Sequence, residues 1–196
     1  MIIEPVTLTG RVVRLEPLSD AHITDLAKVG LEEKIWHFMR YGKVKTIEQL
    51  SAWVHELLKL QAAGTDLPFA VIYLAKGCAI GSTRYLEIDR LNRSMEIGGT
   101  WYGLDYQGTL VNTECKYLLL KHAFEEIGCL RVWFKTDRRN RRSQRAIEKL
   151  GAVKEGVLRN HMILPDGYIR DSVMYSILPQ EWPEVKSKLE AHLRSK

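Results

Sequence analysis

The fold of this chain is decided by residues 94–137, which read SMEIGGTWYGLDYQGTLVNTECKYLLLKHAFEEIGCLRVWFKTD. The first nine and the last seven of these residues are rich in β-branched and aromatic side chains, as strands are. Between them, apolar side chains recur at helical spacing up to a stop at Gly128: Val111, Cys115, Leu118, Leu119 and Ala123. A helix of this length joins two parallel strands in a right-handed sense, so the segment predicts a β-α-β crossover.

The sequence before this crossover predicts one strand, two helices and two more strands. The strand covers residues 11–18, the helices begin near Ile23 and Ile47, and the later strands cover 68–75 and 79–89. After the crossover we expect a short helix at 143–151, a hairpin around Asp166–Gly167 and a helical tail from Pro179. The predicted fold class is α+β, with a mixed, mostly antiparallel sheet in a single domain of residues 1–196.

The composition favours a cytoplasmic protein without membrane spans. Hydrophobic residues make up 45% and charged residues 27% of the 196 residues, and no apolar stretch approaches the roughly 20 residues of a transmembrane helix. The three cysteines are too few for a disulfide framework, and no Cys or His pair has the spacing of zinc ligands. We therefore expect no structural metal. We also expect no signal peptide, because the N-terminal residues have an acid at Glu4 and no long apolar run. The net charge of +5 does not demand a nucleic-acid partner.

The turn between the first strand of the crossover and its helix is a candidate anion site. The helix begins after Gln107, Gly108 and Thr109, so free backbone N–H groups and the positive end of the helix dipole meet there. Asn112 and Thr113 add side-chain donors in the first turn. Pyrophosphate is a common occupant of such a turn. The alternative is that Asn112 only caps the helix.

The same residues resemble a known family, the GNAT superfamily of acyl-CoA-dependent N-acetyltransferases, and within it the RimJ/RimL ribosomal-protein acetyltransferase branch. The resemblance runs from about Arg11 to Trp182, and it rests on the order and spacing of several short motifs rather than on any one of them. The motifs are Glu96-Ile97-Gly98, Trp101-Tyr102, Tyr106-Gln107-Gly108, Ala123-Phe124-Glu125-Glu126-Ile127-Gly128, Arg131-Val132, Asn140-x-x-Ser143, Lys149-Leu150-Gly151, Glu155-Gly156-x-Leu158-Arg159, and Asp166-Gly167 followed by Asp171.

The resemblance implies that acetyl-CoA is the co-substrate. Its pyrophosphate would bind at the start of the central helix, and its pantetheine would pair between two parallel strands that splay apart. The residues that this implies for acetyl-CoA binding are Gln107, Gly108, Thr109, Asn112, Thr113, Asn140 and Arg142. The sequence departs from the family at Leu110, where glycine is expected, and at Asn112, where glycine or alanine is expected. A side chain at Leu110 stands where backbone approaches phosphate, so a weakly binding or inactive member is the alternative.

Three residues are candidates for moving protons in an acetyl transfer. Glu96 occupies a position where family members keep a base, and its alternative role is an ion pair with an arginine such as Arg84. Glu87 is a second candidate base or else a surface charge. Ser143 is a candidate proton donor to the thiolate or else the cap of the following helix. Many relatives use a tyrosine where this chain has Ile147, so that mechanism is excluded here.

The expected function is transfer of an acetyl group to a primary amine, either a protein N-terminus or a small amine. In family members the helices after the first strand shape the acceptor pocket, so the resemblance implies that Trp36, Phe38 and Tyr41 lie around the acceptor. The alternative is an inactive GNAT-fold module that contacts RNA or a ribosomal partner through the arginines of residues 138–145. Those arginines also suit a phosphate of CoA or a solvated surface, and no aromatic residues interleave with them, so nucleic acid is the weaker expectation. A hairpin edge near the C-terminus makes a homodimer plausible.

Overall fold

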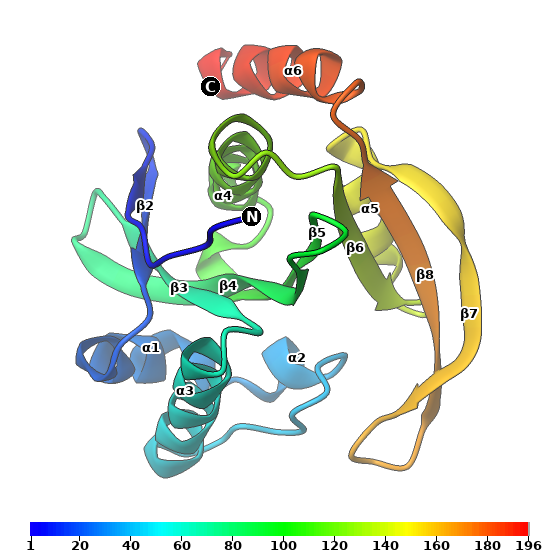
Figure 1. The fold of residues 1–196 in the computed structure, drawn as a ribbon. Helices are drawn as coiled ribbons and strands as arrows, with labels where there is room; N and C mark the ends of the chain where they lie inside the picture. Colours follow the sequence, from blue (N-terminus) through cyan, green and yellow to red (C-terminus); the bar gives the residue numbers. More distant parts are fainter. Residues whose placement is uncertain (196) are drawn as a thin grey trace.

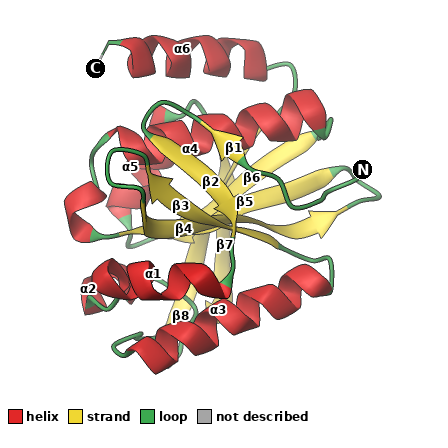
Figure 2. Ribbon diagram, turned by 90° about the vertical axis from the view of Figure 1, so that its left-hand side faces the viewer, coloured by secondary structure: helices red, strands yellow, loops and turns green. Residues whose placement is uncertain are grey.

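The computed structural model describes residues 1–195 and is built on one twisted sheet with helices on both faces (Figure 1, Figure 2). The strand order is β1-β2-β3-β4-β5-β6-β8-β7, and the only parallel neighbours in this part of the chain are β5 and β6. Helix α4 covers one face of the sheet, with α6 packed on the outer side of α4, and α1, α2 and α3 cover the other face. This confirms the predicted α+β fold with a central crossover.

The predicted elements occur in the predicted order, and the structure adds the strand β1 and the short helix α2. The strands are β1 (Leu8–Thr9), β2 (Val13–Pro17), β3 (Leu67–Tyr73), β4 (Cys78–Asp89), β5 (Ser94–Tyr102), β6 (Arg131–Asp137), β7 (Val153–Ile163) and β8 (Ile169–Ile177). The α-helices are α1 (Ile23–Gly30), α2 (Glu33–Trp36), α3 (Ile47–Ala62), α4 (Leu110–Lys121), α5 (Arg141–Lys149) and α6 (Trp182–Arg194). Short 3₁₀ turns precede α1 and α4, and α4 continues as a π-helix (His122–Glu126).

Each face of the sheet carries its own hydrophobic core. On the α4 face, Cys115, Leu119 and Phe134 are buried, as the helical spacing predicts for α4. On the other face Trp36, Trp53 and Trp101 pack edge to face or tilted, with ring centroids 5.4 to 5.8 Å apart. Among residues 1–195 no helix is both long and apolar enough to cross a bilayer.

The parallel strands β5 and β6 are paired over only three residues of each strand. They pair from Ser94 with Arg131 to Glu96 with Trp133, and the described pairing ends there although both strands continue. β5 has a bulge against β4 just beyond this point, at Gly99 and Thr100, which stand opposite Thr83. A Cβ at Gly98 would lie 2.5 Å from Glu96 Oε1 and would displace that carboxylate, and Gly99 has a φ of +57°, which favours glycine. The predicted splay of two parallel strands is therefore confirmed.

The structure corrects two local expectations. Helix α5 begins at Arg141 rather than at Ser143, and its cap is the Asn140 side chain, which accepts a hydrogen bond of 3.0 Å from Ser143 N. Ser143 is therefore not the cap. Helix α4 is capped by Thr109, whose Oγ1 accepts a 3.3 Å hydrogen bond from Val111 N, so Asn112 is not the cap either.

Candidate functional site

Strand β5 borders the opening between β5 and β6, and helix α4 begins a few residues after β5 ends. The end of β5 leads through a 3₁₀ turn at Leu104–Tyr106 into α4. Within residues 1–195, the main-chain N–H groups of Gly108, Thr109 and Leu110 donate to no protein acceptor. Gly108 has a φ of +80° and open space where a Cβ would stand. This turn therefore offers unsatisfied donors and room for an anion at the positive end of a helix.

The structure brings together predicted cofactor-binding residues at the start of α4 and at the start of α5. Gln107 Nε2 donates 2.9 Å to Tyr102 O, and Gln107 Oε1 accepts 2.5 Å from Arg142 Nη1 at the start of α5. Asn112 accepts a 3.3 Å hydrogen bond from the Tyr102 hydroxyl, which fixes the first turn of α4 to β5. Leu110 is only partly buried at the first position of α4. Thr113 is likewise half-buried in this turn.

Helix α4 also buries two charged side chains that the sequence analysis did not single out. Glu114 is 3% exposed and accepts hydrogen bonds of 2.9, 2.7 and 2.7 Å from the main-chain N–H groups of Arg11, Val12 and Val13. Lys116 is 6% exposed, and its Nζ donates 2.6 Å to Thr100 Oγ1 and 3.2 Å to Thr83 Oγ1, beside the β5 bulge. Burial lowers the pKa of Lys116 to about 8. These contacts fasten α4 to β2, β4 and β5.

Glu96 marks the point where β5 and β6 part, on the sheet face opposite α4. It is 2% exposed, and its Oε2 lies 2.8 Å from Lys135 Nζ on β6. Lys135 Nζ also lies 2.7 Å from Glu87 Oε1 on β4. Burial raises the pKa of Glu96, and Lys135 opposes that rise. The two carboxylates predicted as bases thus share one ammonium.

The alternative of an ion pair between Glu96 and Arg84 is not observed, since Arg84 has other partners. Arg84 is 2% exposed, and its Nη1 lies 2.9 Å from Asp66 Oδ2. Its other Nη donates to the Tyr41 hydroxyl, and the guanidinium also stands 5.5 Å from the centre of the Tyr41 ring. Arg84 therefore ties the segment after α2 to the sheet, and Lys135 is the partner of Glu96.

The three predicted acceptor residues differ in position. Trp36 is 1% exposed, and its Nε1 donates 2.7 Å to Gly30 O, so it lies in the aromatic core. Phe38 is half-buried; its carbonyl accepts from Arg170 Nη1 at 3.4 Å, and the guanidinium of Arg139 stands 5.7 Å from its ring. Tyr41 contacts Arg84 as described. The segment that carries Phe38 and Tyr41 therefore packs between β4 and β8.

Lys135 was not predicted as a site residue, although the pattern of its strand places it beside Glu96. In residues 131–137, Val132 and Phe134 face the α4 core, so alternation along the strand puts Lys135 on the face that carries Glu96. A lysine next to two carboxylates could have been inferred from that alternation. Lys116 had no such signal, because a lysine on an amphipathic helix ordinarily lies at the surface.

Comparisons with known proteins agree with this geometry. A family model described as "Acetyltransferase (GNAT) domain" matches residues 13–153. The curated "Putative ribosomal N-acetyltransferase YdaF" of Bacillus subtilis (strain 168) is 31% identical over 109 residues. That match covers 56% of this chain and 58% of the relative, so it spans less than two thirds of the relative's length.

Solved structures match over nearly the whole chain. A crystal structure of a putative acetyltransferase from T. thermophilus is 40% identical with a TM-score of 0.89, covering 98% of this chain and 100% of that chain. Mycobacterium smegmatis RimJ in complex with CoA-disulfide shares the fold with a TM-score of 0.83 at 22% identity, covering 97% of this chain and 96% of that chain. With a family model that spans most of the residues and a fold that matches throughout, the chain belongs to the GNAT acetyltransferase family.

Proposed function

We propose that the protein transfers an acetyl group from acetyl-CoA to a primary amine, either a protein N-terminus or a small amine, by direct attack. The observation that carries this proposal is the position of Glu96. Its carboxylate lies where the β5–β6 pairing ends, on the face opposite the free N–H groups that precede α4. A donor bound at α4 and an acceptor bound beside Glu96 would therefore meet at the opening between the two strands.

The residues at the start of α4 fit acetyl-CoA. Gly108 leaves open space, and the neighbouring N–H groups have no protein acceptor within residues 1–195. Gln107, Thr109, Asn112 and Thr113 would surround the phosphates, with Arg142 and Asn140 contributed from the start of α5. The crystal structure of the fold relative RimJ with CoA-disulfide supports a CoA ligand on this fold. Acetyl-CoA supplies the activated acetyl group as a thioester.

The proposed reaction needs one proton acceptor and one proton donor. The amine nitrogen forms a bond to the thioester carbonyl carbon, and the carbon–sulfur bond breaks to leave a thiolate. Glu96 takes the amine proton directly or through water, with Glu87 as the second candidate base. Its raised pKa suits a base, because proton transfer is most efficient when the pKa of the base lies closer to neutral. Ser143 donates a hydrogen bond to the departing thiolate, directly or through water. Solvent supplies the proton that completes the CoA thiol, and the proton taken by Glu96 is released to solvent.

Calorimetry with acetyl-CoA and CoA, followed by thiol release with candidate amines, tests the proposal. We expect heat on binding, a thermal shift, and amine-dependent thiol release that Glu96→Gln abolishes. No heat and no thermal shift at millimolar acetyl-CoA would contradict it. RNA retention that falls with salt, without CoA binding, would favour the alternative of an inactive module.

The arginine-rich segment gives that alternative little support. Within residues 138–145, Arg138 pairs with Asp171 at 3.4 Å and Arg139 with Asp137 at 2.9 Å. Arginines that have acceptors inside the protein are less available to the phosphates of RNA.

The expected homodimer and cytoplasmic location stay predictions. β7 is an outer strand of the sheet, and exposed Val157 and Leu158 lie on it. Such an edge can pair with a second copy. Light scattering of the purified protein measures the mass directly, and a monomer at all concentrations would exclude the dimer.

A further inference from the structure

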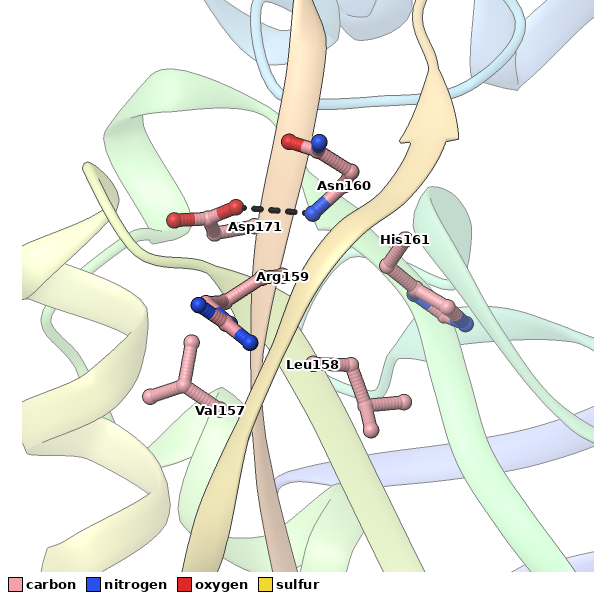
Figure 3. A pocket seen from close by; sticks show the side chains of 6 residues that line it. All are labelled: Val157, Leu158, Arg159, Asn160, His161 and Asp171. Carbon is pink, nitrogen blue, oxygen red and sulfur yellow. Dashed lines mark hydrogen bonds between the residues drawn. The ribbon is translucent and has the colours of Figure 1, made fainter.

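Strand β7 is interrupted opposite a single residue of β8. Leu158 pairs with Ser172 and Met162 pairs with Arg170, so the three residues 159–161 stand opposite Asp171 alone. Asn160 has a φ of +50°, and its N–H donates 2.9 Å to Asp171 Oδ1 (Figure 3). Bulges of this kind redirect side chains. Figure 3 shows Arg159 and Asp171 on one side of the β7 ribbon and His161 on the other.

The imidazole of His161 is held by a buried serine. His161 Nδ1 lies 2.9 Å from Ser172 Oγ, and the same oxygen accepts a 3.0 Å hydrogen bond from Arg170 Nε. Ser172 is 0% exposed and Arg170 is 7% exposed. The ring itself is half-buried and lines an open hollow of about 920 Å³ on β7.

The hydrogen-bond inventory fixes which nitrogen of His161 carries the proton. Arg170 can only donate, and Ser172 has one hydroxyl proton. If His161 Nδ1–H donated to Ser172, the buried hydroxyl proton would have no acceptor among residues 1–195, which is unfavourable. Ser172 therefore donates to Nδ1, and the neutral imidazole carries its proton on Nε2.

The charges around the ring favour the neutral form. Burial lowers the pKa of His161, and Lys135 of β6 and Arg170 of β8 lower it further, whereas Glu87 of β4 raises it. The free Nε2 is then a hydrogen-bond donor at neutral pH and cannot accept a proton there. The residues that perturb this pKa include both partners of the Lys135–Glu87 ion pair, so the charges of the carboxylate site act on the ring.

The position of β7 indicates which substrate His161 faces. Neighbouring strands are about 4.8 Å apart, and β8 separates β7 from β6, so the strand that carries His161 lies about two strand spacings from β6, on whose other side the β5–β6 opening begins. At that separation it would contact the amine substrate rather than the thioester. Arg170 supports the same location, since its Nη1 donates 3.4 Å to the carbonyl of Phe38, a predicted acceptor residue.

We propose that His161 is a specificity-determining residue whose Nε2–H donates a hydrogen bond to an uncharged oxygen of the amine substrate. The matching substrates are amines that carry a carbonyl oxygen near the nitrogen, as an α-amino amide does, and His161 is not the base. This proposal rests on the proposed acetyl transfer. The tautomer on which it depends can be measured without any activity.

Long-range ¹H–¹⁵N correlation spectra of the full-length protein read the tautomer directly. We expect the His161 ring at pH 7 to be neutral with its proton on Nε2, and Ser172→Ala to give a mixture of tautomers. Ser176→Ala, a change to another buried serine of β8, is the matched control and should leave the ring as in the wild type. A charged ring or a proton on Nδ1 in the wild-type protein overturns the proposal.

Kinetics with acetyl-CoA and two amines test the contact. The ratio of kcat/KM for an alanyl dipeptide amide to that for n-butylamine should fall about tenfold in His161→Phe, the effect of one lost hydrogen bond. His161→Gln keeps an N–H donor and should stay close to the wild type. His192→Phe, at an exposed histidine, is the matched control.

The outcomes separate the two proposals. An unchanged ratio in His161→Phe overturns the contact. A loss of the acidic limb of the pH profile in both His161→Phe and His161→Gln would make His161 a base and also overturn it. If the wild type acetylates neither amine and does not bind acetyl-CoA, the proposed function fails, whereas the spectra still decide whether Nε2 is the donor.

Discussion

Lys135 Nζ lies 2.8 Å from Glu96 Oε2, and this contact joins the two parallel strands across the point where their pairing ends. Glu96 is 2% exposed, so its carboxylate has little water to stabilise its charge. Burial raises the pKa of Glu96 and the ammonium of Lys135 opposes that rise. Burial and Lys135 therefore act in opposite directions on the pH range over which Glu96 is ionised.

Replacement of Lys135 by methionine should shift the pH dependence of acetyl transfer. Without the ammonium the pKa of Glu96 rises further, so the base is protonated up to a higher pH. We expect the acidic limb of the kcat/KM profile to move to higher pH, and stability to fall by about 3–5 kcal/mol because a buried charge loses its partner. Lys135→Arg keeps the charge and is the control. An acidic limb that stays in place in Lys135→Met would show that Glu96 is not the base.

Glu114 should be a major determinant of stability without taking part in the chemistry. Its carboxylate accepts three main-chain hydrogen bonds from residues 11–13. Glu114→Ala leaves those donors without a partner, so we expect a loss of about 3–5 kcal/mol in the free energy of unfolding. Denaturant unfolding measures it, with the exposed Glu4→Ala as control. Equal stability of the two variants would contradict the prediction.

Replacement of Gly108 by alanine should weaken acetyl-CoA binding, and Gly77, which has a similar backbone conformation, provides the control. Gly108 and Gly77 have φ values of +80° and +62°, and at neither residue does any atom lie within 4 Å of the place where a Cβ would stand. Alanine at either position costs about 1–2 kcal/mol of backbone strain. Only Gly108→Ala should raise the KM for acetyl-CoA, because its Cβ would stand beside the free N–H groups of the α4 turn. A rise of the same size in Gly77→Ala would mean that strain alone is responsible.

Lys116 should make the stability of the protein depend on alkaline pH. Burial lowers its pKa from 10.5 to about 8, so between these values the folded protein has lost a proton that the unfolded chain keeps. The free energy of unfolding therefore rises with pH across that range. The stability of the wild type relative to Lys116→Met should increase by up to about 3 kcal/mol from pH 7 to pH 10.

The control for Lys116 is a lysine at the surface. Lys154 is exposed, and Lys154→Met should differ from the wild type by a constant amount over the same pH range. Chemical denaturation at several pH values gives these differences. A difference for Lys116→Met that does not change with pH would show that its ammonium stays protonated in the folded state.

Local patterns predicted most of the helices and strands. The alternation in β5 and β6 and the helical spacing in α4 are set by which side chains face the core, and these repeats are visible in the chain itself. The cap of α5 was misplaced by three residues, because Asn140 and Ser143 are both good caps and only the backbone of residue 140 decides between them. The short α2 lacked enough residues to show a period.

The candidate site was harder to predict because its parts come from distant strands. Glu87, Glu96 and Lys135 meet across β4, β5 and β6. Which cation would pair with Glu96 could not be read from spacing, since Arg84 was as suitable by charge and is bound instead to Asp66. The role of His161 likewise depends on a bulge in β7 and on a serine eleven positions later in the chain.

The sequence by itself determined the order of the strands and helices, the central crossover and the membership of the chain in its family. These follow from side-chain periodicity, turn residues and motif order, which act over a few neighbouring residues. Only the tertiary structure decided which charged groups are buried together, which amides before α4 stay free, and which nitrogen of His161 holds a proton. Ion pairs and hydrogen bonds act over about 3 Å between residues far apart in the chain, so they exist only once the sheet has formed.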